Sequence, residues 1–67
     1  FVIPPEWADA ALSDLVSGNN VRPMSITRTG KAFLPENSDI LQEGDILHIS
    51  ATFEGAEQVR HQLERKG

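Results

Sequence analysis

The chain has 67 residues, with six basic and ten acidic side chains, a net charge of −4 and no cysteine. This length allows one small domain with a thin core, and without cysteine the domain has neither disulfides nor thiolate metal sites. The acidic balance argues against binding of nucleic-acid phosphates, and no apolar run is long enough to cross a membrane. Because the chain opens with Phe1 and lacks a leader segment, we expect residues 1–67 to be a single domain of a longer protein.

The first third of the chain predicts a strand end followed by a helix. Phe1-Val2-Ile3 is β-branched and aromatic, and the two prolines that follow would end a strand. Residues 6–17 contain no glycine or proline, and their apolar residues recur at steps of three and four, which predicts one amphipathic helix. Gly18 then supplies a left-handed helix stop.

The middle of the chain predicts a hairpin. Residues 21–28 alternate apolar and polar side chains, as in Met24 and Ile26 against Ser25 and Thr27, which is the period of a half-buried strand. Pro23 restricts its end of this strand to an edge, a bulge or a terminus. Gly30, at a positive φ, would connect residues 21–28 to a second arm that ends at Pro35.

The last third predicts a turn, a strand and a helix. Gly44 lies where a turn needs positive φ, and the strand 46–50 that follows alternates between two faces. Thr52 is placed to cap a final helix that ends at Lys66 and Gly67. One side of this helix carries an apolar stripe of Ala56, Val59 and Leu63. On the exposed side, Glu57 is spaced to pair with His61, and Arg60 with Glu64.

The element order is β-α-β-β-β-α, which predicts the α+β class, with one small sheet and the helices packed on one of its faces. The second face of such a sheet would carry Val, Met and Ile side chains that stay partly wet in a monomer. A partner subunit would cover that face, so we expect a homodimer.

The sequence lacks the residue arrangements that are typical of active sites, so we expect that this protein is not an enzyme. His48 and His61 lack companion ligands at metal-site spacing, and no nucleophile elbow or phosphate-binding glycine loop occurs. Arg22 and Arg28 are six residues apart, which places them on the same face of an undistorted strand. Two interpretations remain for Arg22, Arg28 and Lys31: a polar rim paired with carboxylates, or an anion contact in a cleft beside Asn20 and Pro23.

Three segments together resemble the TrkA-C domain, the C-terminal subdomain of RCK/KTN regulators. Ile26-Thr27-Arg28-Thr29-Gly30-Lys31 contains a hairpin motif I-x-R-x-G, Leu34-Pro35 ends the next strand, and Leu41-Gln42-Glu43-Gly44-Asp45-Ile46-Leu47 contains L-x-x-G-D-x-L. The resemblance covers nearly the whole chain and has the same order of elements.

The resemblance implies a cytosolic, ligand-sensing and dimerising regulatory domain of a potassium or other cation transport system. Such domains are partners of a membrane transporter or channel, in the same chain or in another, and therefore lie in the cytoplasm at the inner face of the membrane without inserting into it. In some members the dimer cleft binds cyclic di-adenosine monophosphate, or another small ligand such as an ion. The alternative is a structural dimerisation module that has no ligand of its own.

The resemblance also implies where a ligand would bind. In ligand-binding members the cleft is lined by the segment between the first helix and the next strand, together with the start of that strand. This stretch corresponds here to residues 19–24, in which Asn20, Arg22, Pro23 and Met24 are the candidate ligand-binding residues. Members that bind the cyclic dinucleotide tend to have an arginine before this segment and an asparagine in its strand. The matching positions here hold Val16 and Arg22.

Overall fold

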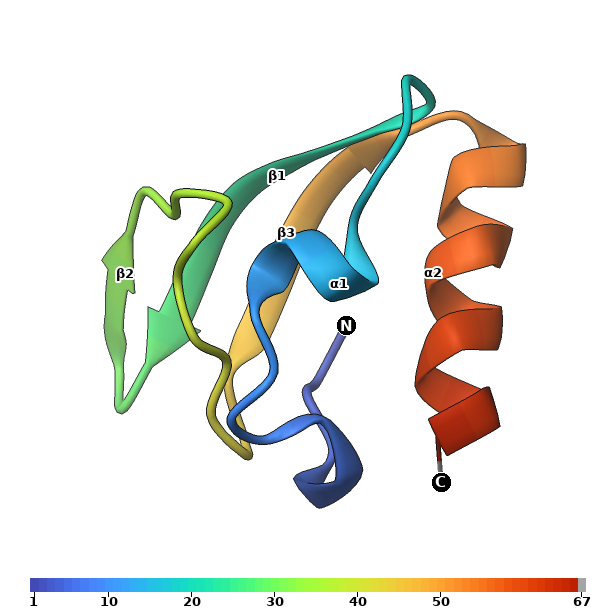
Figure 1. The fold of residues 1–67 in the computed structure, drawn as a ribbon. Helices are drawn as coiled ribbons and strands as arrows, with labels where there is room; N and C mark the ends of the chain where they lie inside the picture. Colours follow the sequence, from blue (N-terminus) through green and yellow to red (C-terminus); the bar gives the residue numbers. More distant parts are fainter. Residues whose placement is uncertain (67) are drawn as a thin grey trace.

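The computed structural model describes residues 1–66, which form a three-stranded antiparallel sheet with the helical segments on one face (Figure 1). The strand order is β2-β1-β3. The elements in chain order are η1 (Pro5–Trp7), α1 (Leu12–Leu15), β1 (Val21–Arg28), β2 (Lys31–Phe33), β3 (Ile46–Ala51) and α2 (Phe53–Lys66). The predicted α+β class is therefore confirmed, whereas the predicted helix stop at Gly67 lies outside the described residues.

The two predicted glycine turns are confirmed. Arg28 pairs with Lys31, so the β1–β2 hairpin has a two-residue turn whose residues Thr29 and Gly30 both have positive φ, 49° and 81°. Turns of this kind match the right-handed twist of the strands they join. Gly44 has a φ of 87° and begins the approach to β3.

A β-bulge in β1 changes which side chains share a face. Pro23 pairs with Ile49 and Ser25 with His48, so Met24 is an extra residue without an opposite partner. The alternation of side chains between the two sheet faces is therefore reversed after the bulge. The prediction that Arg22 and Arg28 share a face is wrong. Ile26 is fully buried opposite Leu47, whereas the Met24 side chain is 54% exposed.

The predicted single helix over residues 6–17 is also wrong. Asp9 has a φ of 72°, and the residues around it are extended and pair with the loop that precedes β3. The Asp9 amide donates to the Leu41 carbonyl at 2.9 Å, and the Leu41 amide donates to the Ala10 carbonyl at 2.8 Å. These long-range bonds replace the helical ones, so only the short η1 and α1 remain helical.

The predicted first strand is reduced to an isolated bridge beside β3. Val2 pairs with Ile46, and the Leu47 amide donates to the Phe1 carbonyl at 2.7 Å. The side chains of Ile3 and Trp7 are buried at 1% and 4% exposure. The N-terminal segment therefore extends the sheet next to β3 and then turns onto its covered face, in front of the sheet in Figure 1.

The core lies between this covered face and the helical layer. Its buried side chains are Ile3, Trp7, Leu12, Leu15, Val16, Val21, Ile26, Leu41, Leu47 and Val59. Helix α2 supplies Val59 and lies next to β3 (Figure 1). The Thr52 hydroxyl accepts the Gly55 amide at 3.0 Å, which confirms the predicted cap. None of the helices within residues 1–66 is long and apolar enough to cross a membrane.

The opposite face of the sheet carries exposed apolar side chains. Val2, Ile46 and Thr27 lie in one row across the strands because Val2 pairs with Ile46 and Ile46 pairs with Thr27. Val2 is 65% exposed and Ile46 40% exposed, and Met24 adds a further exposed side chain at the bulge. We call Val2, Met24 and Ile46 the open-face patch; it matches the Val, Met and Ile residues that the sequence predicted for this face.

Candidate functional site

The predicted cleft segment lines a hollow of about 680 Å³ beside the start of β1. Arg22 and Pro23 form one wall, and the residues after α1 form the other. The loop before β3 closes one side with Asn37, because the Ser13 amide donates to the Asn37 carbonyl at 3.1 Å and holds the two segments together. The volume is in the range of small-molecule sites.

The charge of this hollow, which we call the Arg22 cleft, favours an anion. None of the residues that line it is acidic, although the whole chain has a net charge of −4. Arg22 is exposed and makes no ion pair with any residue in the described range 1–66. Its guanidinium is thus available to a carboxylate or phosphate, which it can bind with two parallel hydrogen bonds.

The other two predicted site residues lie apart from the Arg22 cleft. The Asn20 carbonyl accepts the Thr52 amide at 3.0 Å, and its backbone packs against Gly55, so this residue fixes the start of α2. Asn20 also lines a shallower hollow of about 300 Å³ on the other side of Arg22. Met24 points into solvent from the bulge.

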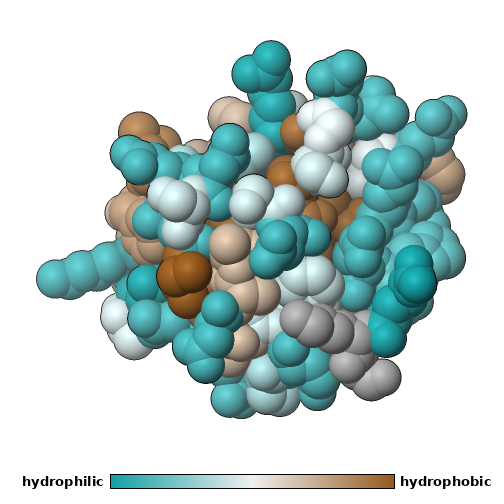
Figure 2. Space-filling model, viewed as in Figure 1, coloured by the Kyte–Doolittle hydropathy of each residue, from teal (hydrophilic) through white to brown (hydrophobic). Residues whose placement is uncertain are grey.

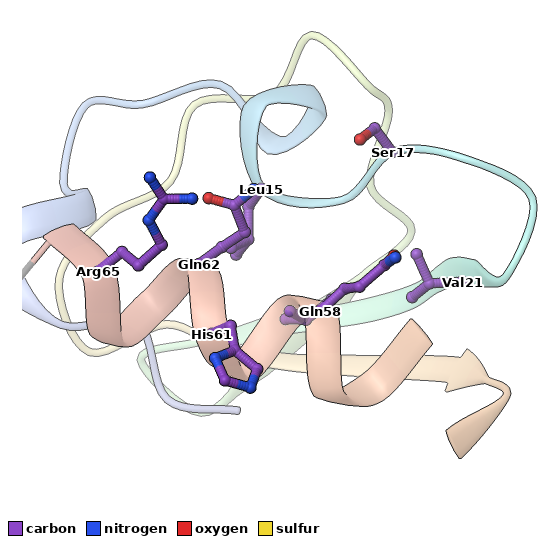
Figure 3. Close-up of a pocket in the computed structure, with 8 residues that line it drawn as sticks. Leu15, Ser17, Val21, Gln58, His61, Gln62 and Arg65 are labelled. Carbon is purple, nitrogen blue, oxygen red and sulfur yellow. The ribbon is translucent and has the colours of Figure 1, made fainter. Parts of the chain in front are cut away.

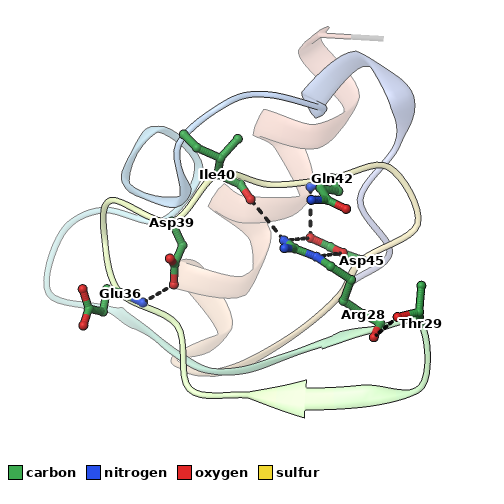
Figure 4. Close-up of polar contacts among 7 residues, drawn as sticks. All are labelled: Arg28, Thr29, Glu36, Asp39, Ile40, Gln42 and Asp45. Carbon is green, nitrogen blue, oxygen red and sulfur yellow. Dashed lines mark hydrogen bonds and ion pairs between the residues drawn. The ribbon is translucent and has the colours of Figure 1, made fainter.

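Arg28 has a structural partner. Its guanidinium donates two hydrogen bonds to the Asp45 carboxylate, at 2.9 and 2.8 Å, and one to the Ile40 carbonyl at 3.1 Å (Figure 4). It also lies 5.1 Å from the centre of the Phe33 ring. For Arg28, the interpretation as a rim residue paired with a carboxylate is therefore confirmed.

Asp45 is the buried member of this pair, with 1% of its side chain exposed. The pKa of its carboxyl is lowered, first by the hydrogen bonds from Arg28 and further by the Gln42 amide, which donates to Oδ2 at 3.0 Å. The same contact raises the pKa of the Arg28 guanidinium. Both groups therefore stay charged in the folded protein, where they tie the hairpin to the loop that precedes β3.

The histidines do not form a metal site. Within the part of the chain that the structure describes, His, Cys, Asp and Glu residues nowhere form a group of three or more that could hold a metal ion. His48 is exposed on the open sheet face, and the His61 Nε2 lies 3.9 Å from the Glu57 carboxylate on α2. The charge pairs predicted on this helix are both present, since Arg60 also contacts Glu64 at 2.9 Å.

Sequence reasoning missed that Ser13 and Asn37 line the Arg22 cleft. The two residues are far apart along the chain and meet only through the pairing of the segment around residue 12 with the loop before β3. No local pattern signals this pairing, because turn residues such as those at 36–39 occur in many loops.

Comparison with known proteins gives consistent matches. A family model described as the TrkA-C domain matches residues 1–64. The Trk system potassium uptake protein TrkA of Streptomyces coelicolor is 40% identical over 43 residues, which are 64% of this chain and 19% of that protein. The chain thus spans about a fifth of this curated relative. A solved structure described as an RCK domain with cda superposes with a TM-score of 0.75 at 18% identity, over 92% of this chain and 89% of the other.

Proposed function

This chain belongs to the TrkA-C domain family, and we propose that it is a regulatory domain of a potassium or other cation transport system. The similarity to a potassium uptake protein supports the transport context, and the RCK-domain fold supports a regulatory rather than a catalytic role. The curated relative is about five times longer than the matched region. We therefore propose that these residues act as one domain of a longer protein, in the cytoplasm and beside a membrane transporter or channel.

The observation that carries the proposal of ligand sensing is the Arg22 cleft. It combines Arg22, which makes no ion pair within residues 1–66, with an apolar wall that includes Pro23 and with described lining residues of which none is acidic. A small anionic ligand fits this chemistry, and the RCK domain of similar fold was solved with cda. A ligand that prefers one arrangement of the domain shifts the population toward it and thereby biases the attached transport protein.

We propose further that the domain works as a homodimer through the open-face patch. Val2, Met24 and Ile46 are exposed on a sheet face that none of the helices within residues 1–66 covers. Burying apolar area contributes about 25 cal/mol per Å², so covering the patch would add to the thin core of a chain this short. Met24 and Arg22 belong to the same end of β1, which brings a partner on this face close to the Arg22 cleft.

One observation favours the second candidate, a structural dimerisation module without a ligand. The position that carries an arginine in relatives binding the cyclic dinucleotide is Val16 here, and its side chain is only 7% exposed in the wall of the Arg22 cleft. The cleft therefore lacks the arginine that the resemblance implies at this position. Under this alternative, the domain transmits conformational change through its dimer contacts alone.

Calorimetric titration of the protein with cyclic di-adenosine monophosphate and with simpler nucleotides separates the two candidates. Under ligand sensing, the wild type and Lys31→Gln bind, whereas Arg22→Gln binds about tenfold more weakly because a charged hydrogen-bond donor is lost. Lys31 is a matched control since it is also an exposed cation but lies outside the cleft. No heat with any nucleotide would favour the structural module.

Sedimentation velocity over a range of concentrations tests the dimer. We expect association that weakens in Ile46→Lys, which places a charge in the open-face patch, and that is kept in the cleft variant Arg22→Gln. A single monomeric species at every concentration would contradict the proposed interface.

A further inference from the structure

A second hollow, distinct from the Arg22 cleft, lies between α2 and the segment that joins α1 to β1 (Figure 3). Its volume is about 410 Å³. Leu15, Val21 and Val59 form its floor, and each of these side chains is at most 5% exposed. Figure 2 shows hydrophobic atoms in a depression between α1 and α2, bordered by hydrophilic side chains of α2.

The rim of this α2 groove is polar and comes mainly from one side of the helix. Gln58, Gln62 and Arg65 are spaced by four and three residues, so they share one face of α2, and Ser17 lies on the opposite wall. In Figure 3 Arg65 and Gln62 lie on the side of α2 toward Leu15. The groove therefore combines an apolar floor with amide, hydroxyl and guanidinium donors at its edge.

The charge of the α2 groove is positive. None of its lining residues is acidic, and Arg65 has no acidic partner within residues 1–66. The other arginine of the helix differs, because Arg60 contacts Glu57 at 2.6 Å and Glu64 at 2.9 Å. The Glu57 carboxylate, which Arg60 holds, also lies 3.9 Å from Nε2 of the rim residue His61.

We propose that the α2 groove is a second binding site, for a small organic anion with an apolar body. The anionic group lies at the Arg65 guanidinium and accepts hydrogen bonds from Gln62, while the apolar body covers the floor of Leu15, Val21 and Val59. Arginine binds phosphate and carboxylate groups through paired donors, and a mostly apolar floor with a few polar groups is the usual form of a small-molecule site.

A ligand bound in the α2 groove can affect the Arg22 cleft, because the two hollows share a wall. Ser17 and Val21 line both hollows, so the loop between them separates the two. A ligand that holds this loop from the α2 side also restricts the wall of the Arg22 cleft. The two sites are therefore expected to change each other's affinity by the same factor.

Titration followed by amide chemical shifts of the protein tests the site with a matched set of compounds. The set is 1-naphthyl phosphate, 1-naphthoate, inorganic phosphate and neutral 1-naphthol, which separates the phosphate, the carboxylate and the apolar contributions. We expect at least one naphthyl anion to shift the amides of Ser17, Gln62 and Arg65 at millimolar concentration. Inorganic phosphate and 1-naphthol should each bind about tenfold more weakly, because each lacks one half of the recognised chemistry.

Two arginine variants provide the control. Arg65→Gln should weaken binding of the naphthyl anion about tenfold, and Arg60→Gln by less than about twofold. Both side chains are exposed on α2, so the fold is kept and the two variants remove the same charge. Equal loss in both variants, shifts confined to the residues around Arg22, or no shift with any of the four compounds would each overturn the proposed site.

Discussion

The Arg28–Asp45 pair gives the sharpest test of how this small domain is held together. Asp45→Asn keeps the shape of the side chain but removes its charge, and it places an amide NH2 opposite donors from Arg28 or Gln42. Each hydrogen bond to a charged group contributes about 1.5–3 kcal/mol, and breaking a buried ion pair costs about 3–5 kcal/mol. The Arg28 side chain is 28% exposed and can regain water, so we expect a loss of about 2–3 kcal/mol.

This loss is a large fraction of the stability of a chain this short, which is about 3–10 kcal/mol at the usual value per residue. Thermal unfolding followed by circular dichroism should therefore show a midpoint about 10–20 °C lower in Asp45→Asn. Asp39→Asn is the matched control, because Asp39 is less buried and accepts one hydrogen bond, from the Glu36 amide at 2.7 Å. We expect the control to lose less than about 1 kcal/mol.

The pH dependence of the same pair has a defined sign. The pKa of Asp45 is lower in the folded protein than in the unfolded chain, where it is about 3.9. The stabilisation is therefore present above about pH 4 and is lost as the pH falls through the folded pKa. Asp45→Asn should remove part of this loss in acid. Stability within about 0.5 kcal/mol of the wild type, with an unchanged acid limb, would refute the structural role assigned to the pair.

Three further substitutions test other features, each by urea unfolding. Gly55→Ala should destabilise by about 1–3 kcal/mol despite the higher helix propensity of alanine, since its Cβ would meet the backbone of Asn20; a gain in stability would mean that this contact is wrong. Gly44→Val should cost about 1–3 kcal/mol because it forces a β-branched residue to a φ of 87°, and a neutral result would contradict the turn. Ile49→Asp places a charge on the covered face of β3 and should lower the urea midpoint of unfolding; an unchanged midpoint would contradict the orientation of the strand.

Features that depend on neighbouring residues were predictable from the sequence. The hairpin turn at Gly30, the turn at Gly44 and the cap at Thr52 are all present as expected. Each is set by a local requirement, either a positive φ or an unsatisfied amide at a helix start, and such requirements restrict the residue type at one position. The fold class followed because these local features fix the order of the elements.

Features that depend on distant contacts were not predictable. Trp7, Leu12 and Leu15 are among the regularly spaced apolar residues of segment 6–17 and are all buried, but the segment does not form the single helix that this spacing predicted. A helix and an irregular segment can bury the same side chains, and here pairing with the loop before β3 outweighs helix propensity, a term of less than about 1 kcal/mol per residue. The position of the bulge at Met24 likewise depends on the register with β3, which Pro23 permits but does not determine.

The candidate site was predicted in part for the same reason. Arg22 and Pro23 lie in the cleft because they follow directly from the segment between α1 and β1. The ligand-binding role of Asn20 stays a prediction. Its backbone holds the start of α2, through a close approach at Gly55 that has no sequence signature. The α2 groove was missed altogether, since it forms only when α2 packs beside Leu15.

The residues that identify the family and the residues that line the two hollows are different sets. The motif segments, residues 26–31, 34–35 and 41–47, surround the Arg28–Asp45 pair and the turns at Gly30 and Gly44. Neither the Arg22 cleft nor the α2 groove is lined by any of them. The motifs therefore identify the structural framework of the domain and not its binding sites. Two family members can share these motifs while binding different ligands. Ligand chemistry has to be inferred from the charge and shape of the hollows, where Arg22 and Arg65 are the arginines among the lining residues.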